Sequence, residues 1–145
     1  MKIILACIDY SDVTHPVLDA AAEQARLSGA KVHLLHVAPI AEYAMYSPGA
    51  EIMLPVGPAV AVDVSLDRSR LLALAAQMAG IETSVEMREG NAVAEILDEI
   101  KLKSADMVVI GSHGHSAFFE LIVGSVTEGV LRRSTVPVLV VPSRK

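Results

Sequence analysis

Apolar and polar positions alternate along the chain in a regular series of short strands and longer helices. The near-continuous apolar run from Ile3 to Ile8 is typical of a strand that is covered on both faces. Thr14 and Pro16 are residue types that begin helices, and the apolar positions after them share one helical face until Gly29. A second strand is predicted over 31–37. The chain therefore opens with a β-α-β unit.

Two further helices are predicted, each with its apolar residues on one face. The first ends at Gly80, and its apolar positions, spaced i, i+3, i+4 and i+7, are Leu71, Leu74, Ala75 and Met78. The second has Asn91 as its expected N-cap, and its apolar positions are Val93, Ile96, Leu97 and Ile100. Both helices are expected to pack one face on a sheet.

Three more strands and a short last helix complete the pattern. Residues 81–87 alternate between apolar and polar, so one face of this strand is expected to be wet or lightly covered. Residues 107–110 and 136–141 are apolar and are expected to be buried strands. A glycine-rich stretch and a short helix ending near Arg132 and Arg133 separate these two strands.

The order β-α-β-α-β-α-β-α-β predicts an α/β fold: a doubly wound, five-stranded parallel sheet with helices on both faces. The strand with polar alternation and the strand containing Pro137 suit the two edges, which gives the strand order 3-2-1-4-5. In that order the winding reverses between the first and fourth strands, where such sheets bind ligands at their carboxyl ends. The residues that arrive there are Asp9 and Gly111.

Composition narrows the class of protein. The 145 residues, 52% of them apolar, predict one domain spanning 1–145. A net charge of −5 and an aromatic content of 3% argue against nucleic acid as a partner. The apolar run at the amino terminus is too short for membrane insertion or secretion, and a single cysteine, Cys7, excludes an internal disulfide. We therefore expect a cytoplasmic protein.

The segment from Ala38 to Ser65 has no regular pattern and holds four of the seven prolines. Structureless loops longer than about 15 residues are uncommon inside compact domains. The segment is either a lid or partner-contact element, or a mobile insertion, and the sequence leaves both interpretations open.

The most informative stretch runs from Ile110 to Thr127 and joins a buried strand to a helix. Its glycines allow the backbone to approach a bulky anion, and the helix that begins near Gly124 and Ser125 presents unpaired N–H groups. These features predict a phosphate site. Taken alone, Ser125 fits simple N-capping better than phosphate binding, and the glycines fit an ordinary loop equally well. Their position at the expected crevice, opposite Asp9, favours phosphate binding.

Other phosphate and nucleophile motifs do not fit this stretch. Gly124 and Gly129 have Walker A spacing, but Val130 and Leu131 stand where Lys and Ser or Thr should follow. No G-x-G-x-x-G fingerprint is present, and the segment 114–118 ends in Phe where a nucleophile elbow has Gly. A serine hydrolase is therefore not favoured.

The spacing Gly111-x-x-Gly114, nine residues, then Gly124-Ser125 resembles the ATP-binding signature of universal stress proteins. The similarity spans nearly the whole chain. It includes Ile8-Asp9-Tyr10-Ser11 after the first strand, Leu35-His36-Val37 in the second, and the terminal segment Val136-Pro137-Val138-Leu139-Val140-Val141-Pro142. Tyr10 departs from the small residues that are frequent at its position, and the segment 38–65 is of the type that varies within the family.

The resemblance implies a role for each residue of the site. Asp9 would meet the ribose hydroxyls, Val37 would bind the adenine edge through its backbone, and Gly111 would lie against the sugar. The phosphates would be cradled by Gly114, Gly124, Ser125 and the amides of Val126 and Thr127, with the loop lined by Ser112, His113, His115 and Ser116. Asp9 has a second possible role as a loop-capping acid. Cys7 lies near the expected base, although a small buried hydrophobe is its simpler role.

The expected ligand is ATP with Mg²⁺, and the expected function is that of a homodimeric regulatory module in a stress response. No Lys or Arg occurs from Gly111 to Val130, which argues against fast phosphoryl transfer. The alternatives are a slow ATPase or nucleotidyl-transferring enzyme, and a dimer that ignores nucleotide. The pair His113 and His115 fits a polar loop better than a metal site, because no third ligand is evident.

The last strand is apolar and lies at a predicted sheet edge, where unpaired backbone groups invite another strand. Twofold pairing through Val138, Leu139, Val140 and Val141 would cover this edge, and the resemblance implies the same dimer. The alternative is that the chain's own helix or tail covers it. The sequence identifies no protein partner.

Overall fold

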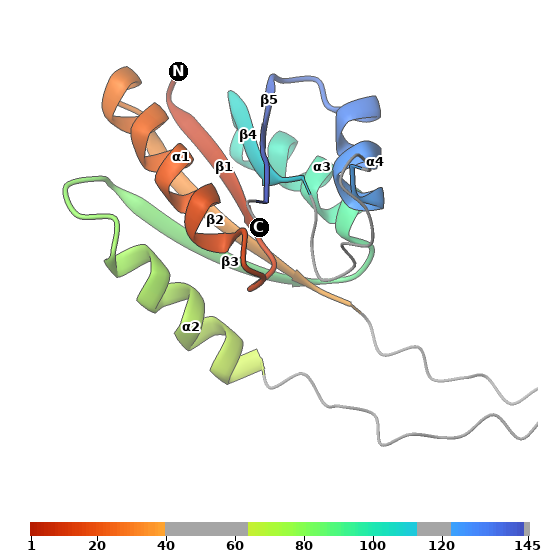
Figure 1. The fold of residues 1–145 in the computed structure, drawn as a ribbon, viewed down its shortest axis with the longest axis horizontal. Helices are drawn as coiled ribbons and strands as arrows, with labels where there is room; N and C mark the ends of the chain where they lie inside the picture. Colours follow the sequence, from red (N-terminus) through yellow and green to blue (C-terminus); the bar gives the residue numbers. More distant parts are fainter. Residues whose placement is uncertain (40–63, 113–122, 144–145) are drawn as a thin grey trace, which may run out of the picture.

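The computed structural model describes residues 1–39, 64–112 and 123–143, which build a parallel sheet with helices on both faces (Figure 1). The strands are β1 (Ile3–Ile8), β2 (Lys31–Ala38), β3 (Thr83–Glu89), β4 (Met107–Gly111) and β5 (Val138–Val141). The helices are α1 (Thr14–Ser28), α2 (Val64–Ala76), α3 (Ala92–Lys103) and α4 (Ser125–Arg133). The strand order is β3-β2-β1-β4-β5, and every pairing is parallel. The predicted doubly wound fold is confirmed.

The sheet separates two apolar layers. One layer packs α1 and α2 on the sheet, with Ile4, Val17, Leu34 and Leu71 at 5% exposure or less. The other packs α3 and α4 on the opposite face around a second set of buried residues, which includes Leu5, Leu35, Ile96, Ile100 and Val130. The central strands are mostly apolar on both faces because both faces are covered, and β2 adds the buried polar residues His33 and His36.

Two helix ends follow directly from the sequence. Gly29 adopts the left-handed conformation with φ +69°, and its N–H donates to the carbonyl of Ala25 at 2.8 Å, which ends α1 as predicted. The side chain of Asn91 accepts from the N–H of Ala94 at 3.1 Å and caps α3, also as predicted.

Several predicted boundaries are wrong by a few residues. The helix predicted to reach Gly80 ends at Ala76 and is followed by turns, because the N–H of Met78 donates to the carbonyl of Ala75, one residue short of a helical bond. β3 begins at Thr83 instead of residue 81, and β5 begins at Val138 instead of residue 136. The segment from Ala38 to Ser65, predicted to be irregular, is regular at both ends: Ala38 is the last residue of β2, and residues 64 and 65 are the first two of α2. The rest of it, from residue 40 to 63, lies outside the described residues.

The order of the strands fixes the place of a crevice. α1 follows β1 on one face of the sheet and α4 follows β4 on the other, so the helices after these neighbouring strands cover opposite faces (Figure 1). A gap between such connections is the usual ligand position in open α/β sheets. The candidate site therefore lies at the carboxyl ends of β1, β2 and β4.

Candidate functional site

Asp9 follows β1 directly and organises the turn into α1. One carboxylate oxygen, Oδ1, accepts from the backbone N–H of Ser11 at 3.0 Å and from the Ser11 hydroxyl at 2.6 Å. The carbonyl of Ser11 then accepts from the N–H of Thr14 at 3.1 Å, at the first residue of α1. The loop-capping role of Asp9 is thus present in the structure. Sequence reasoning named Ser11 in the motif after the first strand but missed its hydrogen bonds to Asp9, although an Asp two residues before a backbone donor is a known turn signal.

Cys7 and Val37 pack on the α3 and α4 face of the sheet, beside Asp9. Burial, and next the nearby negative charge of Asp9, raise the pKa of the Cys7 thiol to about 12. The thiol is therefore neutral near pH 7 and behaves as a small apolar wall, as its simpler predicted role requires. Both side chains contact the same apolar layer.

The backbone of Val37 turns toward the crevice. Along β2, the N–H of Lys31 donates to Lys2 on the β1 side, so the odd-numbered residues of this strand direct their backbone groups toward β1. The register between β1 and β2 ends at Ile8 opposite His36, one residue before Val37. The carbonyl of Val37 is therefore directed to the space beyond the end of β1.

Gly111 ends β4 in close contact with the start of α1. A Cβ atom on Gly111 would lie 2.4 Å from Cγ1 of Val13, which is the residue before α1 and is 2% exposed. Val13 therefore gives Gly111 a packing reason to be glycine that does not depend on a ligand. Sequence reasoning missed this contact, because nothing in the spacing of the two residues indicates that they meet.

Two hydrogen bonds hold the first turn of α4 against the end of β4. The N–H of Gly124 donates to the carbonyl of Ser112 at 2.7 Å, and the buried hydroxyl of Thr127 donates to the carbonyl of Gly111 at 2.7 Å. The Thr127 hydroxyl is thus used in a hydrogen bond within the fold. Its backbone N–H lies in the first turn of α4. The beginning of α4 is fixed relative to the crevice.

The amides of Ser125, Val126 and Thr127 lie at the amino terminus of α4. The first bond of the helix runs from the N–H of Glu128 to the carbonyl of Gly124, so the three preceding N–H groups have no acceptor within the helix. Gly124 is the N-cap and supplies no side chain, whereas Ser125 is already the first helical residue and is exposed. The alternative that Ser125 serves only as the N-cap of this helix is therefore wrong.

Ser112 links the site to the end of the chain. Its N–H donates to the carbonyl of Val141 at 2.7 Å, which extends the β4–β5 ladder by one residue. Its hydroxyl accepts from the N–H of Ser143 at 3.2 Å. Ser112 thus fixes the segment that follows β5 beside the site.

Nine of the thirteen predicted site residues are described, and all nine lie at the carboxyl end of the sheet or at the start of α4: Cys7, Asp9, Val37, Gly111, Ser112, Gly124, Ser125, Val126 and Thr127. The other four, His113, Gly114, His115 and Ser116, lie outside the described residues. Across the described ranges, no group of three or more His, Cys, Asp or Glu side chains could hold a metal ion. No helix within these same ranges is long and apolar enough to cross a membrane.

The parallel sheet, with its strand order and its helices on both faces, defines a Rossmann-like α/β domain. Within that class, the chain belongs to the universal stress protein family, whose family model matches residues 1–142. It is 31% identical over 143 residues to universal stress protein YxiE of Bacillus subtilis, covering 95% of this chain and 97% of that protein.

Solved structures agree with this assignment. A universal stress protein family member from Burkholderia pseudomallei superposes with a TM-score of 0.72 at 25% identity, covering 98% of this chain and 96% of that one. The universal stress protein from Archaeoglobus fulgidus in complex with dAMP superposes with a TM-score of 0.67 at 23% identity, covering 97% of each chain. This second likeness shows that the fold is shared.

Proposed function

We propose that this chain binds an adenine nucleotide, ATP accompanied by Mg²⁺, in the crevice between Asp9 and the start of α4, with residues 1–145 acting as one nucleotide-binding domain. The observation that carries the proposal is the row of three backbone amides at 125–127, held on the end of β4 by two hydrogen bonds. A fixed row of N–H groups at a helix amino terminus suits the phosphates of a nucleotide.

The charges around α4 support an anion at its first turn. Glu128 is the acidic residue in that turn, but its carboxylate accepts two hydrogen bonds from Arg132 one turn further on, at 2.7 and 2.9 Å. Arg132 and Arg133 lie in the last turn, where cations are favourable. The acidic side chain is thus directed along the helix toward its own partner. We infer that the amide row binds phosphates together with Gly124 and, as the family resemblance implies, Gly114.

The opposite end of the crevice suits a nucleoside. The carboxylate of Asp9 is an acceptor for ribose hydroxyls, and the carbonyl of Val37 is an acceptor for the adenine amino group. Cys7 supplies an apolar wall beside the base, and Gly111 lies next to the sugar. The complex of the Archaeoglobus fulgidus relative with dAMP supports an adenine nucleotide as the ligand class. Ser112, His113, His115 and Ser116 are assigned to the phosphate loop on the family resemblance.

The magnesium ion would arrive with the nucleotide. Mg²⁺ keeps several waters and binds through substrate phosphates and one or two carboxylates. Asp9 is the candidate carboxylate, and the described residues hold no larger acidic cluster. The chain's own contribution is therefore to hold the phosphates, while the ion neutralises part of their charge when it is bound.

We assign the nucleotide a regulatory role. The segment from Gly111 to Val130 has no Lys or Arg to stabilise charge on a transferred phosphoryl group. Turnover well below about 1 s⁻¹ is expected, under the range typical of enzymes. The nucleotide state would alter contacts with a protein partner, and a cytoplasmic location stays a prediction from composition.

A homodimer through β5 is part of this proposal. β5 forms one edge of the sheet, and its four residues are only partly buried. The carbonyl of Pro137 accepts from Val108 of β4, and that of Val141 accepts from Ser112, just after β4. The backbone groups of Val138 and Val140 are therefore directed away from β4. This edge can pair with the same strand of a second copy.

Calorimetric titration with ATP, ADP and AMP tests the nucleotide site. The backbone of Gly124, at φ −60° and ψ 153°, is open to any residue, so Gly124→Val should fold normally while placing a branched side chain at the phosphate position. We expect the wild type to bind ATP and this variant to lose binding. Ser134→Val is a control at the other end of the same helix, at φ −63° and ψ 138°. It also removes the two hydrogen bonds between the Ser134 hydroxyl and the backbone of Val136, so it includes a loss of local stability away from the phosphate position.

The control should bind ATP as the wild type does. Unfolding measurements provide a second readout, since ATP at 100 times its dissociation constant should stabilise the wild type by about 2.7 kcal/mol and leave Gly124→Val unchanged. Full ATP affinity in Gly124→Val would refute the phosphate assignment. Absence of heat and of stabilisation with every nucleotide would refute the proposed function as a whole.

A further inference from the structure

We infer that Tyr10, His36 and Arg70 form a stack that positions Asp9 for ribose recognition, and thereby sets the preference of the site for ribonucleotides over deoxyribonucleotides. The inference rests on the proposed function. The three residues come from the β1–α1 turn, from β2 and from α2, so elements distant in the sequence meet beside Asp9.

The backbone of Tyr10 is in an unfavourable conformation. Its φ is +60°, in the left-handed region, and only one other non-glycine residue of the described ranges, Ser104, has a positive φ. Bulky residues rarely adopt this conformation, and it persists only where the surroundings hold it. Glycine or asparagine would make the same turn without this cost. The contacts of the Tyr10 side chain are therefore what we expect to hold this conformation.

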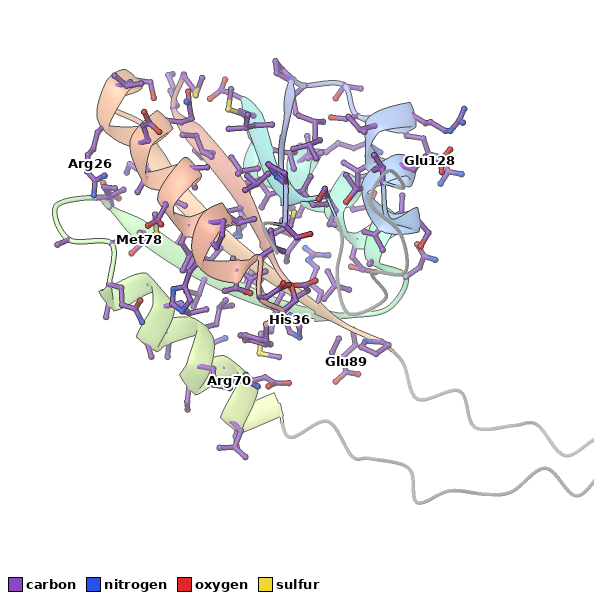
Figure 2. The ribbon with its side chains drawn as sticks, viewed as in Figure 1. Arg26, His36, Arg70, Met78, Glu89 and Glu128 are labelled. Carbon is purple, nitrogen blue, oxygen red and sulfur yellow. The ribbon has the colours of Figure 1, made fainter. Side chains whose placement is uncertain are left out.

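Three contacts hold the Tyr10 side chain. Its ring lies on the imidazole of His36, with centroids 4.4 Å apart and planes inclined by 43°. The guanidinium carbon of Arg70 lies 4.3 Å from the ring centroid, at cation–π distance. The phenol donates to the backbone carbonyl of Asp67 at 2.6 Å. Figure 2 shows Arg70 on α2 and His36 near the carboxyl end of the sheet.

The phenol stays a donor at neutral pH. Burial, and then the negative charge of Asp67, raise the pKa of Tyr10 to about 12, against the opposing effect of Arg70. The hydrogen bond to α2 is therefore present throughout the physiological range. The hydrogen bond from the Tyr10 hydroxyl therefore joins the β1–α1 turn to α2 at every physiological pH.

The stack reaches Asp9 from both sides along the chain. Ile8 precedes Asp9, and its carbonyl is bound by Nδ1 of His36 at 2.7 Å. Tyr10 follows Asp9 and is fixed by the ring contacts. With both neighbours held, the backbone of Asp9 has little freedom, and its Oδ1 is further held by Ser11. The carboxylate is thus held in place before a ligand binds, which lowers the cost of ordering it on binding.

Affinities for ATP and 2′-deoxy-ATP, measured by calorimetry on the full chain, test this inference. The deoxynucleotide lacks one hydroxyl that the Asp9 carboxylate would accept, so the wild type should bind it about tenfold more weakly, as expected for a hydrogen bond to a charged group. In Tyr10→Gly, which keeps the turn and removes the stack, the ratio of affinities should fall to about two or less. Arg70→Ala should lower the ratio in the same direction.

Two variants are controls. Tyr10→Phe keeps both ring contacts and should keep most of the ratio. Arg68→Ala removes an exposed arginine of the same helix and should leave the ratio unchanged. A general loss of stability would weaken both nucleotides equally, so the ratio separates positioning from a merely structural effect. Arg70 is exposed, and Arg70→Ala therefore remains informative even if Tyr10→Gly does not fold.

The outcomes are distinct. If the wild type binds neither nucleotide, the proposed function itself fails. If it prefers ATP and both Tyr10→Gly and Arg70→Ala keep that preference, the positioning stack is refuted while the nucleotide site stands. Equal wild-type affinity for the two nucleotides would also overturn the inference, because Asp9 would then not read the 2′-hydroxyl.

Discussion

A buried ionic cluster on the α3 face of the sheet makes the stability of the fold depend on a few single residues. Glu99 is 0% exposed, and its carboxylate lies 2.8 Å from Nε2 of His33 and 2.5 Å from Nη2 of Arg88. The other ring nitrogen of His33 lies 2.7 Å from the hydroxyl of Ser84. Lys103 approaches the same carboxylate at 3.7 Å. Removing one partner of such a cluster leaves a buried charge uncompensated and is strongly destabilising.

The cluster predicts a pH dependence of stability. Burial, in first place, and the positive charge of Lys103 lower the pKa of His33 below 6.5, against the hydrogen bond and charge of Glu99 and the charge of Glu86. The unfolded chain therefore takes up a proton at a higher pH than the folded chain does. Stability from this residue is full above pH 6.5 and falls as the pH drops from there toward the folded pKa.

Urea unfolding of the wild type and of His33→Gln, from pH 7.5 to pH 5, measures this effect. The difference in unfolding free energy between the two should shrink as the pH falls, because only the wild type loses the contribution of His33. A difference that grows on acidification would mean that the imidazolium form is bound better than the neutral form, and would contradict the assignment.

At the scale of elements, α3 and α4 approach closely at one glycine. A Cβ atom on Gly129 would lie 2.7 Å from Cγ2 of Val93. Val93 is short and β-branched, so it cannot easily rotate away. The glycine therefore sets the distance at which α4 packs on α3, and with it the place of the amide row at the start of α4.

Gly129→Ala should destabilise the protein by about 1 kcal/mol. Helix propensity favours alanine by roughly 0.5–1 kcal/mol, but overpacking costs about 1–3 kcal/mol. In a Val93→Ala background the clash disappears, and the same substitution should become neutral or stabilising. Denaturation midpoints of the wild type, the two single variants and the double variant give the coupling energy between positions 93 and 129. If Gly129→Ala alone stabilised the protein, α3 and α4 could move apart at little cost and the packing argument would be wrong.

The elements themselves could be predicted from the sequence, and their ends only in part. Gly29 and Asn91 end and begin helices through local chemistry, so both were predictable. The carboxyl end of α2 was not, because Leu74 and Met78 keep their helical spacing although Met78 lies in a turn that still buries it. The apolar pattern indicates which residues are buried, but it does not show whether the last of them lie in the helix or in a turn that follows the helix.

The candidate site was likewise predictable only in part. The strand order brings Asp9, Gly111 and the start of α4 together, and this follows from topology alone. The contacts of Gly111 with Val13 and of Tyr10 with Arg70 join residues whose spacing carries no signal. Predicting such contacts needs the packed positions of the helices, which pattern alone does not supply.

For the molecule as a whole, the sheet edge formed by β5 in the described residues predicts the assembly. The N–H of Val140 is directed away from β4, so Val140→Pro should leave the β4–β5 ladder intact and remove a donor from the dimer interface. We expect this variant to sediment as a monomer and the wild type as a dimer. Dimers in both would place the interface elsewhere, and a monomeric wild type would refute the proposed dimer.

The proposed function requires that backbone amides at the start of α4 bind the phosphates of a nucleotide whose sugar faces Asp9. A ¹⁵N-resolved NMR titration of the wild type with ATP and Mg²⁺ is the decisive test. Among the described residues, the amide signals of Ser125, Val126 and Thr127 should shift most, since their N–H groups lie at the amino terminus of α4 and have no acceptor within the helix. If these signals stay in place while ATP saturates the protein, the nucleotide binds elsewhere and the account is contradicted.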